Sequence, residues 1–263
     1  MLEYPSLSPI VFSVGPLAIR WYSLAYIGGI GLGTFLFKNE FKKWFNFTYL
    51  DCLDFMSYIM IGVLLGGRLG YVLFYDLIYY VSHPLEIVAI WNGGMSYHGG
   101  AIGAVIAMYF FSKVKKVSFF SLIDILAVGS TIGIFLGRLA NFVNGELFGR
   151  ETSVPWGMIF PSGGQIVRHP SQLYEAFFEG FVLFCILYFL MKKMEFKPGV
   201  IFGLYLIGYG FFRFFCEFFR APDSQLGTLV LGLSMGQLLC LAMISLGGIV
   251  LSFLGRTPNS ELQ

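Results

Sequence analysis

Residues 125–137 read Ile125-Leu-Ala-Val-Gly-Ser-Thr-Ile-Gly-Ile-Phe-Leu-Gly137, an almost wholly apolar run that ends in a cluster of polar side chains. Directly after it come Arg138, Asn141, Asn144 and Glu146. A guanidinium and a carboxylate are costly at the edge of a membrane span, and ionisable groups placed there usually mark a site of function. The stretch therefore predicts a membrane-spanning helix with a functional site at one end.

The composition is that of a helical membrane protein. The chain has 263 residues, of which 57% are hydrophobic and only 12% are charged. A soluble domain of this size would carry about a quarter of charged residues, whereas apolar runs of ~17–25 residues can span a bilayer. We therefore predict an all-α polytopic membrane protein in which residues 1–263 form a single integral membrane domain.

The lysines set the predicted topology. All nine fall in three short clusters: Lys38, Lys42 and Lys43; Lys113, Lys115 and Lys116; Lys192, Lys193 and Lys197. Basic residues in short loops mark the cytoplasmic side of a membrane protein. The apolar segments between the clusters predict about seven spans, near residues 17–37, 53–75, 94–112, 121–143, 174–191, 198–216 and 227–254. The N-terminus is then outside, and the C-terminus is inside.

Three segments are predicted at the outer surface. The chain begins without the basic start of a cleavable signal peptide, so residues 1–16 are expected to form an outer-surface arm. Residues 144–173 are rich in proline and glycine and predict a small head on the outer face with one short hairpin. Residues 76–93 form a second, smaller outer segment. No internal repeat is visible in the sequence, which disfavours a transporter built from inverted repeats.

Arg138 and Asn141 are three residues apart, so they share a face of the predicted helix. A guanidinium presents a planar fork that matches the oxygens of a phosphate group, which indicates an anion site. The residues alone fit equally well with a buried structural ion pair between Arg138 and Glu146 or another acid.

A second arginine lies near the end of the sixth predicted span, in Tyr209-Gly-Phe-Phe-Arg213-Phe-Phe-Cys-Glu217. Arg213 and Glu217 could form an ordinary i,i+4 pair, worth a few tenths of a kcal/mol if exposed. The flanking phenylalanines leave little room for water, however, and Arg213 is expected at the same level as Arg138. The two arginines would then form a clamp on a lipid phosphate. Arg220, farther along, is interpreted as an anchor for lipid headgroups.

Two more ionisable side chains fall in predicted spans. His98 opens the third span, and histidine is the side chain whose unperturbed pKa lies near neutrality. It is therefore either a candidate base or a hydrogen-bond partner of a neighbouring helix. Arg68 is interpreted as a structural or access residue, with Asp54, Asp76 or Glu146 as possible counter-ions.

The polar cluster carries a resemblance to a known family. Its sequence, Gly137-Arg-Leu-Ala-Asn-Phe-Val-Asn-Gly-Glu-Leu-Phe-Gly149, matches at every fixed position the signature G-R-x-x-N-F-x-N-x-E-x-x-G of prolipoprotein diacylglyceryl transferases. The chain also resembles this family in the H-G-G-x-I-G stretch that begins at His98 and in the run Arg168–Glu175. The resemblance extends from Trp21 to Gln237.

The resemblance implies a transferase of the bacterial inner membrane. Members of this family move the diacylglyceryl group of phosphatidylglycerol onto the lipobox cysteine of a prolipoprotein, which leaves glycerol phosphate and a thioether. This is the first step of lipoprotein maturation. The implied partners are phosphatidylglycerol, a prolipoprotein signal peptide with its lipobox cysteine, and membrane lipids. We expect no cofactor, no metal and no nucleic acid, because the sequence contains no metal-binding or nucleotide-binding motif.

The resemblance also implies a set of site residues. His98, Arg138 and Arg213 are the expected catalytic residues. The expected substrate-binding residues are Tyr22, Arg138, Asn141, Asn144, Glu146, Gly149, Tyr209, Arg213 and Glu217. His169 and Glu175 are expected to position these residues without contacting the substrate themselves.

The alternative function is a polytopic lipid transporter or flippase, which would also place arginines at the outer leaflet. Such a protein would be expected to show broken-helix symmetry or charges spread through the membrane depth. The polar groups of this chain instead cluster toward one face. A structural or receptor membrane protein would have no need for the Arg-Asn-Glu cluster.

Overall fold

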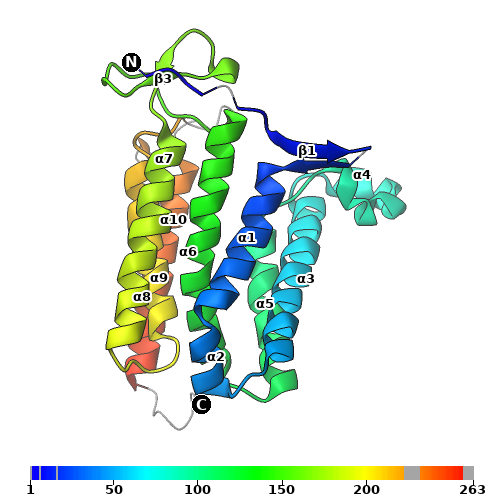
Figure 1. Cartoon of the computed structure of the whole chain (residues 1–263), viewed down its shortest axis with the longest axis vertical. Helices are drawn as coiled ribbons and strands as arrows, with labels where there is room; N and C mark the ends of the chain where they lie inside the picture. Colours follow the sequence, from blue (N-terminus) through cyan, green and yellow to red (C-terminus); the bar gives the residue numbers. More distant parts are fainter. Residues whose placement is uncertain (1, 6, 16, 222–231, 257–263) are drawn as a thin grey trace. The chain divides into compact units, whose positions relative to one another are not determined.

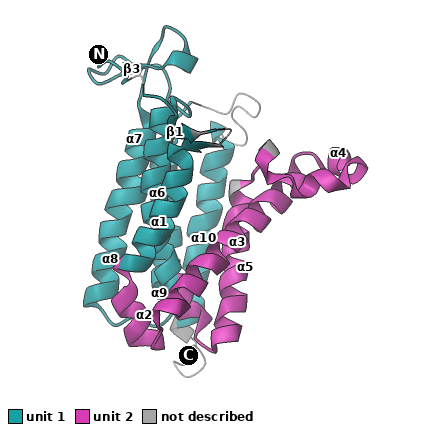
Figure 2. Cartoon of the chain, turned by 45° about the vertical axis from the view of Figure 1, so that its right-hand side comes forward, with its two compact units in different colours: residues 1–35, 124–262 teal, residues 36–123, 263 magenta. Residues whose placement is uncertain are grey.

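The structure is a computed structural model that describes residues 2–5, 7–15, 17–221 and 232–256, and these are mainly helical (Figure 1). Its internal contacts divide the chain into two compact units (Figure 2). The first unit comprises residues 1–35 and 124–262, and the second comprises residues 36–123.

The first unit begins with a hairpin of two strands and continues with long helices. Its elements are β1 (Ile10–Val14), β2 (Leu17–Arg20), α1 (Trp21–Leu36), nearly all of α6 (Phe119–Asn144), β3 (Met158–Ile159), a 3-10 turn (Pro161–Gly163), β4 (Val167–Arg168), α7 (Ser171–Glu175), a π-helical turn (Ala176–Val182), α8 (Leu183–Lys193), α9 (Val200–Cys216) and α10 (Met235–Arg256). From α7 to α8 the chain forms one continuous helix, Ser171–Lys193.

The second unit is built around two long helices. Its elements are α2 (Lys38–Phe45), α3 (Tyr49–Phe74), α4 (Leu77–Ser82), two 3-10 turns (Pro84–Val88 and Ile90–Asn92) and α5 (Tyr97–Lys115). Glycines let α3 and α5 pack closely, because a Cβ atom at Gly66 would collide with the backbone of Gly99 and Gly103. Small residues of this kind are typical of helix contacts inside membranes. The contact fixes the start of α5, where His98 lies, against α3.

The predicted polytopic helical membrane fold is confirmed. Among the described residues, four helices are long and apolar enough to cross a membrane: Tyr49–Phe74, Phe119–Asn144, Ser171–Lys193 and Met235–Leu254. Large apolar side chains such as Leu65, Ile249 and Phe253 are exposed on these helices, as expected of surfaces that face lipid. The remaining helices α1, α5 and α9 overlap the other three predicted spans, so the count of seven stays a prediction.

The prediction for the first span is wrong at its start. Leu17–Arg20 is a strand rather than the first turn of a helix, and it pairs antiparallel with Ile10–Val14. Gly15 has φ +58° in the turn between the two strands, a conformation that glycine adopts without a steric penalty. Backbone pairing in this hairpin therefore delays the helix until Trp21.

The predicted hairpin in residues 144–173 is confirmed, since Met158 pairs with Arg168 and Ile159 pairs with Val167. The N-terminal residues lie against this segment, since the Leu2 N–H donates to the Gly157 carbonyl over 3.1 Å. The Tyr4 hydroxyl donates to the backbone carbonyls of Phe142 and Val143 over 2.8 and 3.0 Å. Those carbonyls belong to the last turn of α6, so Tyr4 satisfies acceptors that a helix end leaves open.

Glycines also allow close packing inside the first unit. A Cβ atom at Gly29 of α1 would lie 2.8 Å from Gly133 of α6, and one at Gly210 of α9 would lie 2.9 Å from the carbonyl of Cys240 in α10. These contacts hold α1 on α6 and α10 on α9. The helices that carry Arg138 and Arg213 are therefore each packed against a neighbour through their backbones.

Candidate active site

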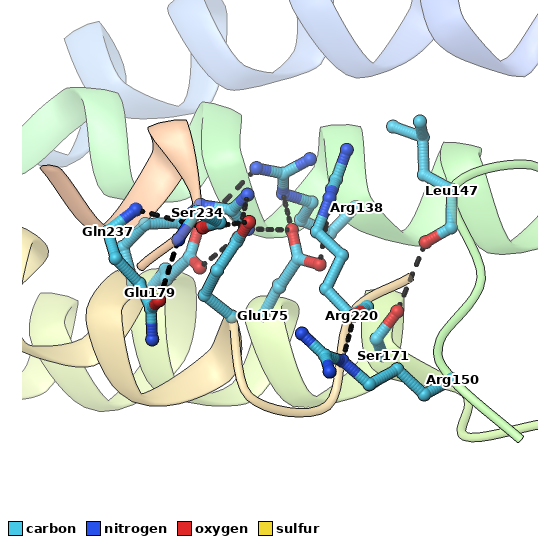
Figure 3. Close-up of polar contacts among 11 residues, drawn as sticks. Arg138, Leu147, Arg150, Ser171, Glu175, Glu179, Arg220, Ser234 and Gln237 are labelled. Atoms are coloured by element: carbon cyan, nitrogen blue, oxygen red, sulfur yellow. Dashed lines mark hydrogen bonds and ion pairs between the residues drawn. The ribbon is translucent and has the colours of Figure 1, made fainter. Parts of the chain in front are cut away.

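One buried carboxylate connects three arginines (Figure 3). Glu175 Oε2 lies 2.9 Å from Arg138 Nε and 2.9 Å from Arg213 Nη1. Its other oxygen, Oε1, lies 3.4 Å from Arg220 Nη1. Arg138 comes from α6 and Arg213 from α9, so two different helices supply guanidinium groups to one point. The two arginines predicted to form a clamp therefore do lie together.

A second buried carboxylate faces the same two arginines. Glu179 Oε2 lies 3.6 Å from Arg138 Nη2, and Glu179 Oε1 lies 3.6 Å from Arg213 Nη1. Glu179 belongs to the π-helical turn, a rare conformation that occurs often at functional sites. Gly180 in the same turn packs directly against Phe135 of α6. A Cβ atom at this position would lie only 2.6–3.0 Å from Phe135, so the close contact requires glycine. The turn thus places Glu179 beside the arginines.

A third carboxylate completes the cluster from the end of α9. Glu217 Oε2 lies 2.7 Å from Arg213 Nη2, so the predicted i,i+4 pair forms, and it forms in a buried place. The Ser234 hydroxyl donates to Glu217 Oε1 over 3.0 Å. The Ser234 N–H donates to Gln237 Oε1, and the Gln237 N–H donates to the Ser234 hydroxyl oxygen, a reciprocal cap at the start of α10. Glu217 thereby links α9 to α10.

The charges of this ionic cluster balance. We define it by six side chains, three basic and three acidic: Arg138, Arg213, Arg220, Glu175, Glu179 and Glu217. The arginine side chains are 13–19% exposed and the glutamates 0–9% exposed. An uncompensated charge in such a place would be strongly destabilising. Pairing each charge with an opposite one offsets the cost of burying these ionisable groups at membrane depth.

The ion pair considered for Arg138 does form, but with acids other than Glu146. Glu146 Oε1 accepts from Asn141 Nδ2 over 2.9 Å and from Asn144 Nδ2 over 3.1 Å. The chain leaves α6 through Gly145 and Leu147, whose φ angles are +65° and +57°. This turn folds Glu146 back onto the two amides. The polar signature residues therefore form two neighbouring groups, one around Glu175 and one around Glu146.

Glu146 is also tied to the start of α7 through its backbone. The Gln172 side chain donates from Nε2 to the Glu146 carbonyl over 2.6 Å, and the Ser171 hydroxyl donates to the Leu147 carbonyl over 3.1 Å. Gln172 and Ser171 are buried. The loop after α6 is therefore fastened to the helix that carries Glu175.

Gly149 lies where three chain segments meet. Its N–H donates to the His169 carbonyl over 2.8 Å, and its backbone forms an isolated bridge with Arg220. A Cβ atom at this position would lie 2.6 Å from His169 Cβ and would overlap the Phe219 carbonyl. The position thus has no room for a side chain. This packing alone explains why residue 149 is a glycine, and a contact with a substrate is not needed to explain it.

The aromatic site residues and His98 lie in different places. Tyr22 is half-buried in α1, with its ring centroid 5.4 Å from that of Tyr26. Tyr209 is buried in α9, the helix of Arg213, with its ring 5.8 Å from that of Tyr205. His98 is exposed at the start of α5, in the second compact unit. Their roles toward a substrate stay predictions.

Two predictions about arginines are wrong, namely the headgroup-anchor role of Arg220 and the carboxylate counter-ions considered for Arg68. Arg220 is not a free headgroup anchor, because its guanidinium contacts the same Glu175 carboxylate that holds Arg138. Arg68 does not use the acids considered as counter-ions. Its guanidinium donates to backbone carbonyls, namely those of Glu86, Ile87, Gly93 and Gly94.

The carbonyls of a loop offer Arg68 several acceptors within the second unit, so a carboxylate is not required. One of the acids considered, Asp54, pairs instead with Lys115 at 2.7 Å. Arg68 thereby holds the segment after α4 against α3. This geometry supports a structural role.

His169, which directly precedes Pro170, makes contacts that stabilise the head (residues 144–173). Its Nδ1 lies 3.1 Å from the Tyr174 hydroxyl, which also accepts from Trp156 Nε1 over 2.7 Å. Burial lowers the pKa of His169 below its ordinary value, because desolvation disfavours the imidazolium. Burial therefore favours the neutral form of the ring.

Glu179 is the residue of the cluster that sequence reasoning missed. It lies inside the predicted span 174–191, four residues after Glu175. An acidic side chain in the middle of an apolar span is itself a signal of function. The same rule that singled out Arg138 would have found it.

Comparison with known proteins identifies the family. A family model described as prolipoprotein diacylglyceryl transferase matches residues 9–253. Three proteins named phosphatidylglycerol–prolipoprotein diacylglyceryl transferase are similar over nearly their whole length. The one from Rickettsia felis is 49% identical over 94% of this chain and 96% of its own. The one from Geobacter sulfurreducens is 49% identical over 94% and 95%.

The third, from Rhodospirillum rubrum, is 47% identical over 97% of this chain and 94% of its own. These matches confirm the resemblance seen in the run Gly137–Gly149. This chain belongs to the prolipoprotein diacylglyceryl transferase family.

Proposed function

We propose that this chain transfers the diacylglyceryl group of phosphatidylglycerol to the lipobox cysteine thiol of a bacterial prolipoprotein. Family membership and the names of its relatives support the enzyme class and the two substrates. The proposal further assigns the lipobox cysteine thiol as the acceptor of the diacylglyceryl group. The products are a thioether-linked prolipoprotein and glycerol phosphate.

The observation that carries this proposal is the meeting of Arg138 and Arg213 at one point. Two guanidinium groups from different helices lie 2.9 Å from the same carboxylate oxygen. Guanidinium groups bind carboxylate and phosphate oxygens with the same planar geometry. A site that holds a carboxylate between two guanidinium groups can therefore hold the phosphate of a lipid headgroup.

The arginines suit the chemistry of the transfer. The thiolate of the cysteine attacks the glyceryl carbon that bears the phosphate ester, a C–S bond forms, and the C–O bond to the phosphate breaks. The electron pair of that bond leaves with glycerol phosphate, whose phosphate gains negative charge. Donors fixed around the departing oxygens stabilise the charge as it develops. Arg138 and Arg213 are the donors that we assign to this task.

The thiol must lose its proton before or during the attack. A free cysteine thiol has a pKa of ~8.5, so a nearby base accelerates the reaction near neutral pH. We assign this role to His98, at the exposed start of α5. Tyr22, Asn141, Asn144, Glu146, Gly149, Tyr209 and Glu217 are assigned to binding and shaping the substrate site.

The proposed setting is the bacterial inner membrane. Lys113 and Lys115 lie in the last turn of α5, and Lys192 and Lys193 in the last turn of α8. Basic side chains there support a cytoplasmic position for both helix ends. The N-terminal arm (residues 1–16) and the head (residues 144–173) are then periplasmic, on one integral membrane domain of residues 1–263.

The test is reconstitution of the purified protein in phosphatidylglycerol vesicles with a lipobox peptide. Mass spectrometry should detect the diacylglyceryl thioether on the cysteine and glycerol phosphate in solution. A peptide with serine in place of cysteine is the matched control and should remain unmodified. Movement of fluorescent lipid between leaflets without any thioether would instead support a flippase and overturn the proposal.

A further inference from the structure

Every arginine of the ionic cluster already has a carboxylate partner, and one glutamate serves all three. Glu175 Oε2 contacts Arg138 and Arg213 at 2.9 Å each, while Glu175 Oε1 contacts Arg220 at 3.4 Å. The carboxylate is fully buried. The arginine clamp is thus occupied by a side chain of the protein itself.

The position of Glu175 Oε2 is also the position that a phosphate oxygen would take. An oxygen that bridges Arg138 and Arg213 must lie within hydrogen-bond reach of both, and Glu175 Oε2 does so already. A second anion at the same point would be repelled by the carboxylate. Phosphate and Glu175 therefore exclude one another from the clamp.

The resting contacts leave hydrogen-bonding capacity unused. Glu175 Oε2 and Arg213 Nη1 are buried, and neither makes an aligned hydrogen bond among the described residues, although they lie 2.9 Å apart. A phosphate group can accept from the guanidinium fork in the aligned, two-point geometry. A phosphate ligand would thus gain directional bonds that Glu175 does not make.

We propose that Glu175 is an exchangeable counter-ion of the clamp, which the lipid phosphate displaces and which returns to expel glycerol phosphate. This inference rests on the proposed transferase function. Arg220 gives the displaced carboxylate a place to go, since its guanidinium already lies beside Glu175 Oε1. Glu175 directly precedes the π-helical turn Ala176–Val182. Rotation of its side chain toward Arg220 keeps every charge opposed in both states.

The exchange solves a problem of product release. The lipid phosphate is a diester with one negative charge, whereas a phosphate monoester carries about −1.5 to −2 near pH 7. An arginine clamp with nothing opposing it would therefore hold the product more tightly than the substrate. A carboxylate that competes for the same two guanidinium groups weakens the binding of both anions. Its return to the clamp favours departure of the product.

The experiment measures equilibrium binding of glycerol phosphate to detergent-solubilised full-length protein by calorimetry. Glu175→Gln should bind glycerol phosphate at least about tenfold more tightly than the wild type, because a close competing charge is removed. In turnover assays the same variant should show stronger inhibition by glycerol phosphate and a lower kcat. Glu151→Gln, at an exposed acid of the head, is the matched control and should bind as the wild type does.

A purely positioning role for Glu175 predicts the opposite sign. If the carboxylate only holds Arg138 and Arg213 in place, Glu175→Gln binds glycerol phosphate more weakly, and this result would overturn the exchange. Unchanged binding would overturn it as well. Arg220→Gln adds a second check. In this variant the displaced Glu175 carboxylate has no guanidinium group to move toward, so its displacement costs more free energy. The variant should therefore bind glycerol phosphate more weakly than the wild type.

Loss of this buried carboxylate can prevent folding, because three arginines then each lose a partner, and of the cluster's acids Arg138 and Arg213 keep only Glu179 and Glu217. The double variant Glu175→Gln with Arg220→Gln removes one charge of each sign and keeps the cluster balanced. It should still bind glycerol phosphate more tightly than the wild type, and weaker binding would overturn the proposal. The binding assay needs no turnover. Absence of thioether formation by the wild type would therefore refute the transferase function and leave the exchange to be judged by binding.

Discussion

Asp124 of α6 accepts a hydrogen bond from the backbone N–H of Phe202, in the first turn of α9, over 2.7 Å. Its second carboxylate oxygen accepts from the N–H of Gly199, also over 2.7 Å. The side chain is buried. One helix thus satisfies the open N–H groups at the start of another, where the helix dipole also favours a negative charge. Because α6 carries Arg138 and α9 carries Arg213, this contact helps to set the level at which the arginines meet.

Asp124→Asn should lower the free energy of unfolding by about 1–3 kcal/mol. An amide can accept at only one of the two positions, and its NH2 group would face a buried backbone N–H. Thermal unfolding in detergent measures the change. Asp54→Asn is the matched control, because that side chain is 52% exposed in its pair with Lys115 and such pairs contribute about 0–1 kcal/mol. Equal losses in both variants would contradict a special role for Asp124.

Arg138→Lys should lose activity by about 100–1000-fold, the cost of removing one donor that stabilises a developing oxyanion. Lysine keeps the positive charge but cannot reach Glu175 with one nitrogen and Glu179 with another, as Arg138 does with Nε and Nη2. Thioether formation by the purified variant measures the effect. Arg20→Lys, at an exposed arginine of β2, should remain within a few-fold of the wild type. Activity of Arg138→Lys at that level would refute the clamp.

The fold could be predicted from the sequence because each signal is local and strong. Apolar length predicted the spans, and the hairpin in residues 144–173 followed from its prolines and glycines. The strand Leu17–Arg20 was missed because its apolar residues suit a strand and a helix equally. Pairing with Ile10–Val14 decided between them, and an antiparallel partner cannot be read from composition.

The site was predictable in its residues but not in its pairings. Arg138 and Arg213 were recognised from their membrane setting and from the family signature. Their common partner Glu175 could not be deduced, since three helices must first be placed side by side. Arg220 shows the same limit. Its sequence position suggested the headgroup region, whereas the chain after α9 turns it back onto Glu175.

Gly149→Ala should reduce both stability and activity. The new methyl group would meet backbone atoms of His169 and Phe219, which cannot move as a flexible side chain could. Overpacking of this kind costs about 1–3 kcal/mol, which thermal unfolding in detergent would detect. Gly248→Ala in α10 is the matched control, because a Cβ atom there meets nothing within 4 Å. The two variants should differ clearly, and equal melting temperatures would contradict the packing argument.

The proposed topology can be tested with single cysteines at Lys113 and Gln165, both of which have exposed side chains. The background should lack the four native cysteines. A membrane-impermeant maleimide added to intact spheroplasts should label position 165 in the head and leave position 113 unlabelled. Lysis should make position 113 reactive. Labelling of 113 without 165 in intact cells would invert the predicted orientation.

His98→Gln should lose activity by about 100–10,000-fold near neutral pH, the usual contribution of a general base. Raising the pH toward the ~8.5 pKa of a free thiol should recover part of the loss, because more thiolate then forms without help. The pH profile of thioether formation, measured as kcat/KM, checks both statements. His83→Gln is the matched control, since that ring stacks on Tyr79 at 4.5 Å beside α4. An equal loss for His98→Gln at every pH would mean that His98 holds structure or lipid, and thiol activation would then fall to the positive field of Arg138 and Arg213.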